Sequence, residues 1–183
     1  MACSSITLKG LPEDCQASMG GIKKIWIMPY EEGRFTLDAS GNTVSAVTSG
    51  TTGESGDTKA YYFKKGNAQA TSTLNVDVQN GVNYVSTEIQ MTFTKQEASK
   101  RAEINALTMG DTSVVYLDAN NHMWAVGVEN PVSATAGTAQ TGAQKSDGNF
   151  YQITLTADES GFPVEITDNT IKGAFLAAGY PTN

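Results

Sequence analysis

The chain has 183 residues, of which 39% are hydrophobic and 17% charged, enough for one domain with a real core and short for two. Its net charge is −7, and residues 111–183 carry eight acidic side chains against two lysines. Because an acidic surface repels phosphate backbones, this balance argues against a protein that grips DNA or RNA, and it leaves the acidic half as either a solvated face or a functional negative lining.

Residues 1–19 form a polar leader, which we expect to be an N-terminal arm before a single domain at 20–183. The leader lacks a basic start and an apolar run, so we expect no secretory signal peptide, and no stretch approaches the roughly 18 apolar residues of a membrane anchor. Cys3 and Cys15 are too few for a disulfide scaffold or a four-ligand zinc site. We expect free thiols, with one disulfide as the alternative.

Strand patterns begin directly after the leader. The stretch GGIKKIWIMPY is strongly apolar over residues 25–28 and is limited by Pro29. RFTLD and TVSAVT predict two short strands around the turn ASGN, and TKAYYFKKG predicts the next strand. Between them, SGTTGESGD at residues 49–57 has no apolar anchor, so we expect a loop or arm there.

A long hairpin is predicted next. TSTLNVDVQ and VNYVSTEIQMTFT alternate apolar and polar residues with period two, and an Asn-Gly pair lies between them. The second strand has about a dozen residues, well above the usual ~5–6. We expect one apolar face of the hairpin to be buried in the core, formed by Leu74, Val76, Val78, Val85, Ile89, Met91 and Phe93.

The stretch TKQEASKRAEINALTMG, residues 94–110, is the one clear helix signature. Thr94 and Glu97 have the spacing of an N-terminal capping box, and Gly110 is expected to close the helix in the left-handed conformation. A surface helix usually has one apolar face, but this helix has two, which predicts that it contacts a neighbour on each side. We therefore interpret the helix as an architectural brace behind the sheet. One face is a stripe of small residues with a methionine and the other is aliphatic: Ala98, Ala102, Ala106 and Met109, then Ile104 and Leu107.

Strands resume beyond the helix. TSVVYLDANNHMWAVGV predicts a hairpin that turns at Asn120-Asn121, and NFYQITLTADESGFPVEI predicts two further strands. NPVSATAGTAQTGAQKS has no sharp pattern, and IKGAFLAAGYPTN is interpreted as a short apolar piece with a tail. With about nine strands, one helix and no repeat, the predicted fold is mainly β, a sandwich or barrel with one helix packed outside.

The sequence predicts no catalytic constellation. His122 is the only histidine, it falls in a predicted hairpin turn, and no G-x-S-x-G elbow accompanies it. Adjacent carboxylates such as Asp158 and Glu159 would point to opposite faces of a strand, and no stretch has calcium-loop spacing. Trp26 and Trp124 are interpreted as core residues, with a sugar-stacking platform as the alternative. We therefore expect no enzyme, no cofactor and no bound metal.

The order of a long hairpin, a helix and a second hairpin resembles the tail-tube fold that phage tail tubes share with type VI secretion tubes and related hub or ring proteins. The segments that carry this resemblance are KRAEINALTMGDTSVVYLDANNHMWAVG and SDGNFYQITLTADES. The leader LPEDCQASMGGIKKIWI also resembles the start of such proteins in phages of the Bacteroidetes.

The resemblance implies a virion structural protein, assembled in the bacterial cytoplasm. It implies a homo-oligomeric ring, a hexamer or a larger ring, in which neighbouring sheets join into one β-barrel and the helix packs outside near the subunit boundary. Other tail or neck proteins would be partners, and genomic DNA would pass through without specific binding. The residues expected to face the lumen are Thr73, Asn75, Asp77, Gln79, Ser86, Glu88, Gln90 and Thr92.

Two other functions are open at this point. A single ring at the neck or hub would use the same fold, and SGTTGESGD as a stacking loop does not decide between one ring and a long tube. A carbohydrate-binding adhesin with a β-sandwich fold is the more distant alternative, supported by the aromatic residues and the polar loops.

Overall fold

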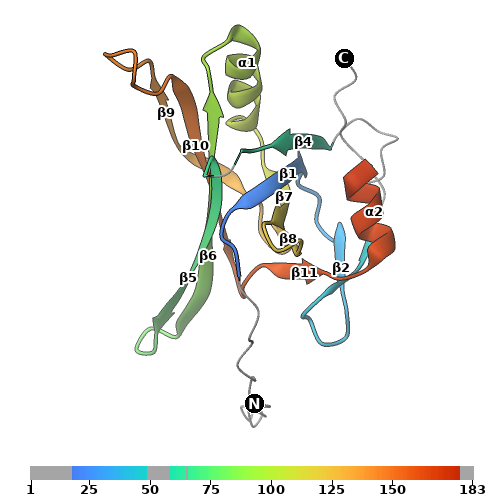
Figure 1. Cartoon of the computed structure of the whole chain (residues 1–183). Coiled ribbons are helices and arrows are strands. Elements are labelled where there is room, and N and C mark those ends of the chain that lie inside the picture. The colour runs from blue at the N-terminus through green and yellow to red at the C-terminus, as the bar shows by residue number, and fades with distance from the viewer. Residues whose placement is uncertain (1–17, 49–57, 65, 178–183) are drawn as a thin grey trace.

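The computed structural model describes residues 18–48, 58–64 and 66–177, which form three layers around two hydrophobic cores (Figure 1). Most of the expected arm at 1–19, with both cysteines, lies outside the described residues, as does the expected loop at 49–57. The prediction of a mainly β fold is confirmed: the sheets are antiparallel, none closes into a barrel within the described residues, and the arrangement fits a β-sandwich with helices.

The middle layer is a five-stranded sheet that is buried on both faces. Its strand order is β11 (Val164–Ile166), β8 (Met123–Val126), β7 (Thr112–Asp118), β1 (Ile22–Pro29) and β4 (Lys59–Tyr62). In β1, Ile25 and Ile27 contribute to one core while Trp26 and Met28 contribute to the other. The unbroken apolar run of β1 therefore reflects its position between two layers, because a strand covered on both faces needs no polar alternation.

The second layer is a four-stranded sheet that is covered on one face. Its order is β5 (Ala68–Asp77), β6 (Val82–Thr94), β10 (Phe150–Glu159) and β9 (Ser133–Gln140). Ile89 and Met91 from β6 and Ile153 and Leu155 from β10 are fully buried against the five-stranded sheet. The residues that alternate with them point away from the core, which explains the period of two along these strands.

The third layer comprises the β2–β3 hairpin and helix α2. β2 (Phe35–Leu37) pairs with β3 (Val44–Val47), and α2 (Asn169–Ala177) packs Phe175 against Trp26 with ring centroids 5.9 Å apart. The prediction of a single helix was wrong, because α2 occupies the stretch interpreted as an apolar piece with a tail. Asp168 caps this helix, since its Oδ1 accepts the N–H groups of Thr170 (2.6 Å) and Ile171 (3.3 Å).

The predicted limits of the first helix were also wrong. α1 spans Ala98–Leu107, and Thr94 is instead the last residue of β6, paired with Phe150. Glu97 is the N-cap residue without a side-chain capping bond, and its carboxylate pairs with lysines on either side. Gly110 has no left-handed φ, because the chain already leaves the helix at Thr108.

The predicted buried face of the long hairpin is correct along one half. Val85, Ile89 and Met91 are buried and Phe93 is partly buried, whereas Leu74, Val76 and Val78 are exposed, contrary to the prediction. The reason is length: β6 has 13 residues and β1 only 8, and the hairpin extends beyond the layer that covers it (Figure 1).

Candidate assembly surfaces

The outer face of the four-stranded sheet, which points away from the core, is a polar surface without positive charge. None of β5, β6, β9 and β10 contains a lysine or arginine, and their charged residues are all acidic. Asp77, Glu88 and Asp158 belong to the outer face and are exposed, whereas Glu159 points the other way and is buried. The surface is therefore neutral to acidic along its whole width.

Neutral side chains bond to one another across this outer face. Thr71 and Thr156 lie opposite Glu88 on its two sides. Gln69 Nε2 donates a hydrogen bond to Gln90 Oε1 at 2.9 Å, and the hydroxyls of Thr135 and Thr156 are 2.8 Å apart. Such cross-strand pairs stabilise the sheet and satisfy the polar groups without a ligand.

The structure places three residues that were predicted to face the lumen on this outer face, and a fourth lies in the adjoining turn. Asp77 and Glu88 are exposed and Gln90 is partly buried, all on the outer side. Gln79 lies in the turn after β5, where its N–H donates to Asp77 Oδ1 at 3.0 Å. A side-chain hydrogen bond from Asn80 is the main cause that lowers the pKa of Asp77, so this carboxylate stays ionised at neutral pH.

Both edges of the four-stranded sheet are long and uncharged. Within the described residues, β5 and β9 each have one neighbour. β5 carries no charge before Asp77, β9 carries none, and neither strand contains a proline. Proteins usually protect exposed edges with lysine, proline or short strands, as the edge strand β4 with Lys59 does here. The unprotected edges are thus templates for pairing with another chain.

The hydrogen bonds between neighbouring strands show which backbone N–H and C=O groups point to these free edges. The N–H of Thr92 donates to the carbonyl of Asn67 at 2.7 Å, and bonded pairs alternate in an antiparallel ladder. It follows that the backbone groups that point to the free edge of β5 belong to Ala68, Ala70, Ser72, Leu74 and Val76. The N–H of Lys95 donates to the carbonyl of Asn149 at 2.7 Å, so successive residues of β10 bond alternately to β6 and to β9. With the register between β10 and β9, the backbone groups of Gly137 and Ala139 therefore point to the free edge of β9.

Helix α1 has one packed side and one open side. Leu107 is buried in the core between the two large sheets and Ile104 packs against it. The Tyr61 hydroxyl donates to Glu103 Oε1 at 2.7 Å and links the helix to β4. Burial is the main cause that raises the pKa of Tyr61, and the Glu103 carboxylate raises it further. The other candidate assembly residues are exposed, as is the methionine that extends their stripe: Ala98, Ala102, Ala106 and Met109.

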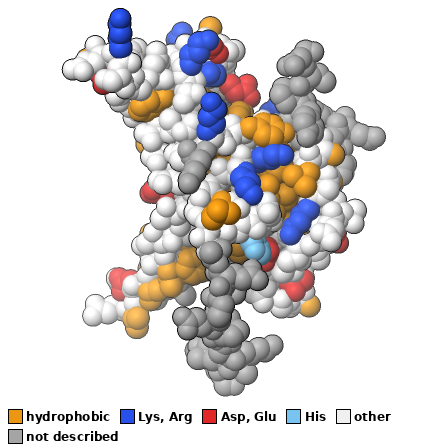
Figure 2. Space-filling model, in the orientation of Figure 1, with side chains coloured by type: hydrophobic (Ala, Val, Ile, Leu, Met, Phe, Trp, Pro, Cys, Tyr) orange, Lys and Arg blue, Asp and Glu red, His pale blue; other side chains and the backbone are white. Residues whose placement is uncertain are grey.

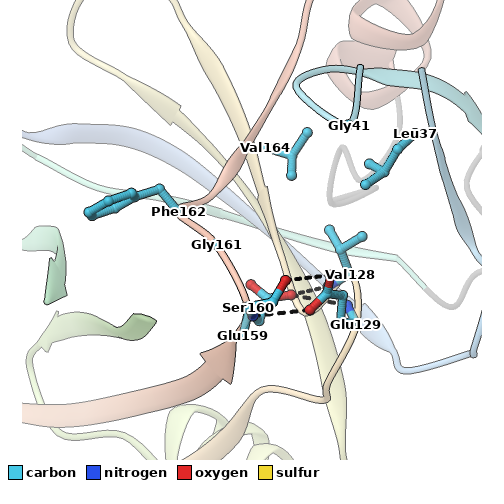
Figure 3. A pocket seen from close by; sticks show the side chains of 9 residues that line it. All are labelled: Leu37, Gly41, Val128, Glu129, Glu159, Ser160, Gly161, Phe162 and Val164. Atoms are coloured by element: carbon cyan, nitrogen blue, oxygen red, sulfur yellow. Dashed lines mark hydrogen bonds between the residues drawn. The ribbon is translucent and has the colours of Figure 1, made fainter. Parts of the chain in front are cut away.

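A buried carboxylate, that of Glu159, fixes the connection between β8 and β9, and the sequence did not predict this role (Figure 3). Glu159 is 6% exposed, and its Oε1 accepts the N–H groups of Val128 (2.6 Å) and Glu129 (3.1 Å). The Glu129 carboxylate accepts in turn from the backbone and hydroxyl of Ser160. The adjoining pocket of about 80 Å³ is far smaller than the ~300 Å³ of the smallest usual ligand sites, so this cluster is structural.

Glu159→Gln is expected to remove a pH-dependent contribution to stability. Burial is the main cause that raises the pKa of Glu159 above its ordinary 4.5, so the folded chain binds this proton more tightly than the unfolded chain. For this group, stability is greatest when the carboxyl is protonated and falls as the pH rises from about 4.5 through the folded pKa. Glutamine does not ionise, and its carbonyl still accepts both N–H bonds.

Urea unfolding of wild type and Glu159→Gln across this pH range measures the effect. The variant should gain stability relative to wild type as the pH rises, and a difference that does not change with pH would contradict the assignment. Glu159→Ala is the comparison variant: it leaves two backbone donors unpaired and should cost about 1–3 kcal/mol for each.

Nothing in the described part of the chain resembles a catalytic or metal centre. His122 is exposed in its turn, as expected, with Nδ1 2.7 Å from Glu165 Oε1. Among residues 18–48, 58–64 and 66–177, no three His, Cys, Asp or Glu side chains are grouped to hold a metal ion. Trp26 is buried and Trp124 half-buried, and no helix in these ranges is long and apolar enough to cross a membrane.

Two features of these surfaces were not predicted from the sequence. β9 has small residues on both faces and no alternation, and only the ladder shows that it is the second free edge. The buried role of Glu159 depends on backbone groups some thirty residues away, for which the sequence has no signal.

Comparisons of the chain with protein-family models, curated proteins and solved structures found no match in any of the three.

Proposed function

We propose that this protein is a virion structural protein: a subunit of a closed ring that lines the DNA channel of a phage tail tube. The observation that carries the proposal is the combination of a cation-free outer face with two unprotected edges on one sheet. Edges of this kind are satisfied when β5 of one copy pairs with β9 of the next, and a closed ring leaves no edge free. The resemblance of the sequence to tail-tube proteins supports the same assignment.

Barrel geometry favours a ring of about six copies. Six four-stranded sheets supply 24 strands. At ~4.8 Å between strands and a tilt of ~40°, these give a barrel of roughly 45–50 Å across at the backbone. A trimer would give about half that diameter, too little for DNA once side chains fill the interior. A neutral to acidic wall then repels the DNA phosphates, so that the duplex moves without binding.

The test is electron microscopy of the purified full chain with two labelled variants. In a Cys3→Ser/Cys15→Ser background, Glu88→Cys places a thiol on the outer face of the sheet and Ala102→Cys places one on the exposed side of α1. Gold-labelled Glu88→Cys should show density in a central channel, and the helix label should show density outside the wall. A chain that stays monomeric at high concentration, or a Glu88 label on the outer circumference, would overturn the proposal.

A further inference from the structure

The turn between β5 and β6 contains the one Asn-Gly pair of the chain, Asn80-Gly81. Both residues are exposed. The pairing of β10 with β6 ends at Val85, so no third strand lies beside the turn. Figure 2 shows that this end of the hairpin projects from the rest of the molecule. Water therefore reaches the Asn-Gly pair.

An asparagine that precedes a glycine can react with its own backbone. The glycine nitrogen loses its proton and forms a bond to the asparagine Cγ, the bond from Cγ to Nδ2 breaks, and ammonia leaves, which gives a succinimide ring. Water then opens the ring at Cγ to give aspartate, or at the backbone carbonyl carbon to give isoaspartate. Glycine favours the first step because it has no Cβ to obstruct the approach of the side chain. The reaction consumes one water, releases one ammonia and needs no cofactor.

The attacking nitrogen of this turn is unprotected. Among the residues that the structure describes, none forms a hydrogen bond with the N–H of Gly81. Gly81 has a φ of 67°, and a side chain at this position would meet no atom within 4 Å. Neither a hydrogen bond nor crowding therefore shields the nucleophile.

The side-chain amide of Asn80, in contrast, is held by Asp77. Asn80 Nδ2 donates a hydrogen bond to Asp77 Oδ2 at 2.6 Å. The other carboxylate oxygen, Oδ1, accepts the backbone N–H groups of Gln79 at 3.0 Å and of Asn80 at 3.2 Å. Because Asp77 is ionised at neutral pH, the bond to the amide is charge-assisted and strong for its kind.

This bond opposes the reaction in two ways. The same carboxylate accepts the N–H of Asn80, so the amide is turned toward the N-terminal side of Asn80, whereas the Gly81 nitrogen lies on its C-terminal side. The amide must therefore leave Asp77 before Cγ can meet the nucleophile. A carboxylate that accepts from the amide also increases the electron density of the amide group, which makes Cγ a poorer electrophile.

We propose that Asn80 is a site of spontaneous deamidation and that Asp77 restrains it: the turn reacts slowly while Asp77 holds the amide, and Asn80 cyclises onto Gly81 when this bond opens. The inference is independent of the proposed function. In the product, Asp77 loses its amide donor and gains a like charge beside it, and isoaspartate also lengthens the backbone of the turn. Both changes loosen the end of the hairpin.

Mass spectrometry of the purified full chain tests the site. After incubation in warm, mildly alkaline buffer, the proteolytic peptide that contains the turn should show replacement of the Asn80 amide by a carboxyl, as a mixture of aspartate and isoaspartate. Asn80→Ser lacks the amide, so its turn peptide should gain no mass. A wild-type turn peptide that stays unmodified after the folded chain and the urea-unfolded chain are incubated would overturn the site.

Asp77→Ala tests the restraint. A hydrogen bond of this kind changes an equilibrium by about threefold to tenfold, so its loss should speed the deamidation of Asn80 by about that factor. Asp147→Ala is the matched control, because it removes another exposed aspartate that accepts two backbone N–H groups in a turn. It should leave the rate at Asn80 unchanged. A rate in Asp77→Ala that equals the wild-type rate or falls below it would overturn the role of Asp77.

Asp77→Ser separates the bond to the amide from the general support of the turn. A serine hydroxyl can still accept the backbone N–H groups two or three residues on, but it offers no second oxygen to the Asn80 amide. We therefore expect Asp77→Ser to deamidate as fast as Asp77→Ala. If it reacted as slowly as wild type, the protection would come from the backbone bonds of the turn, and the proposed restraint of the amide would be wrong.

Discussion

Ser72→Pro is expected to prevent ring formation while leaving the monomer folded. The N–H of Ser72 points to the free edge of β5, away from the bonds that β5 makes with β6. Proline removes this donor and places its ring where a neighbouring strand would approach, and edge positions of this kind are where folded sheets tolerate proline. In the proposed ring, which closes through β5 and β9, each copy would present the same defect, so the lost hydrogen bond would recur at every interface.

A matched control separates the donor from the side chain. The Ser72 hydroxyl lies 2.9 Å from the hydroxyl of the buried Thr87, and proline loses this bond as well as the N–H, at a cost of about 1 kcal/mol for the hydroxyl bond. Ser72→Ala loses the same bond and keeps the N–H, so it should form rings as wild type does. Native mass spectrometry gives the oligomeric state, and urea unfolding shows whether each monomer is folded.

The opposite edge gives an independent test. Ala139→Pro should prevent closure from the β9 side, with Ala139→Ser as the variant that retains the donor. If Ser72→Pro and Ala139→Pro both assemble normally, the rings do not close through these edges. If Ser72→Ala fails as completely as Ser72→Pro, the effect comes from the lost hydroxyl and not from the edge.

The mainly β fold was predictable because alternation and turn residues act locally. The Asn-Gly turn and the period of two located β5 and β6 to within a few residues. The same signals carry no information about what lies above a strand. In β5 the alternation runs through Leu74 and Val76, although the covering layer ends near Val85, so the exposed end of this strand could not be distinguished from a buried one.

Two elements escaped prediction for opposite reasons. β9 consists of small residues at an exposed edge, where neither face is buried deeply enough to impose a pattern. α2 does have a helix signal in the sequence: Asp168 stands before the helix, and Ile171 and Phe175 are four residues apart on the side that packs against the second core. Gly173 inside this short segment weakened the helical pattern.

The outer face of the four-stranded sheet, the candidate assembly surface, was predictable in part. The polar partners of the buried residues of β6 had to share the opposite face, which placed Glu88 and Gln90 correctly. That this face contains no cation across four strands emerges only when β9 and β10 are brought beside β5 and β6 by the fold. The free edges likewise depend on strand order, which pairing between distant segments decides.

The two sides of helix α1 are expected to respond differently to charge, and Leu107→Asp has the larger effect. Leu107 is buried between the two large sheets. Truncating a buried leucine alone costs about 2–5 kcal/mol, and an unpaired buried carboxylate adds to this. Because domains are stable by only about 5–15 kcal/mol, the variant should be largely unfolded, which circular dichroism and urea unfolding would show.

Ala102→Glu changes the open side of the same helix. Ala102 is exposed, glutamate is a good helix former, and the free energy of unfolding should change by no more than about 0.5 kcal/mol. If the alanine stripe contacts a neighbouring subunit, the bulky charge should weaken ring formation in a fully folded chain, and Ala102→Ser should not. Normal rings from Ala102→Glu would limit the helix to bracing its own sheet through Ile104 and Leu107, and normal stability of Leu107→Asp would remove that role as well.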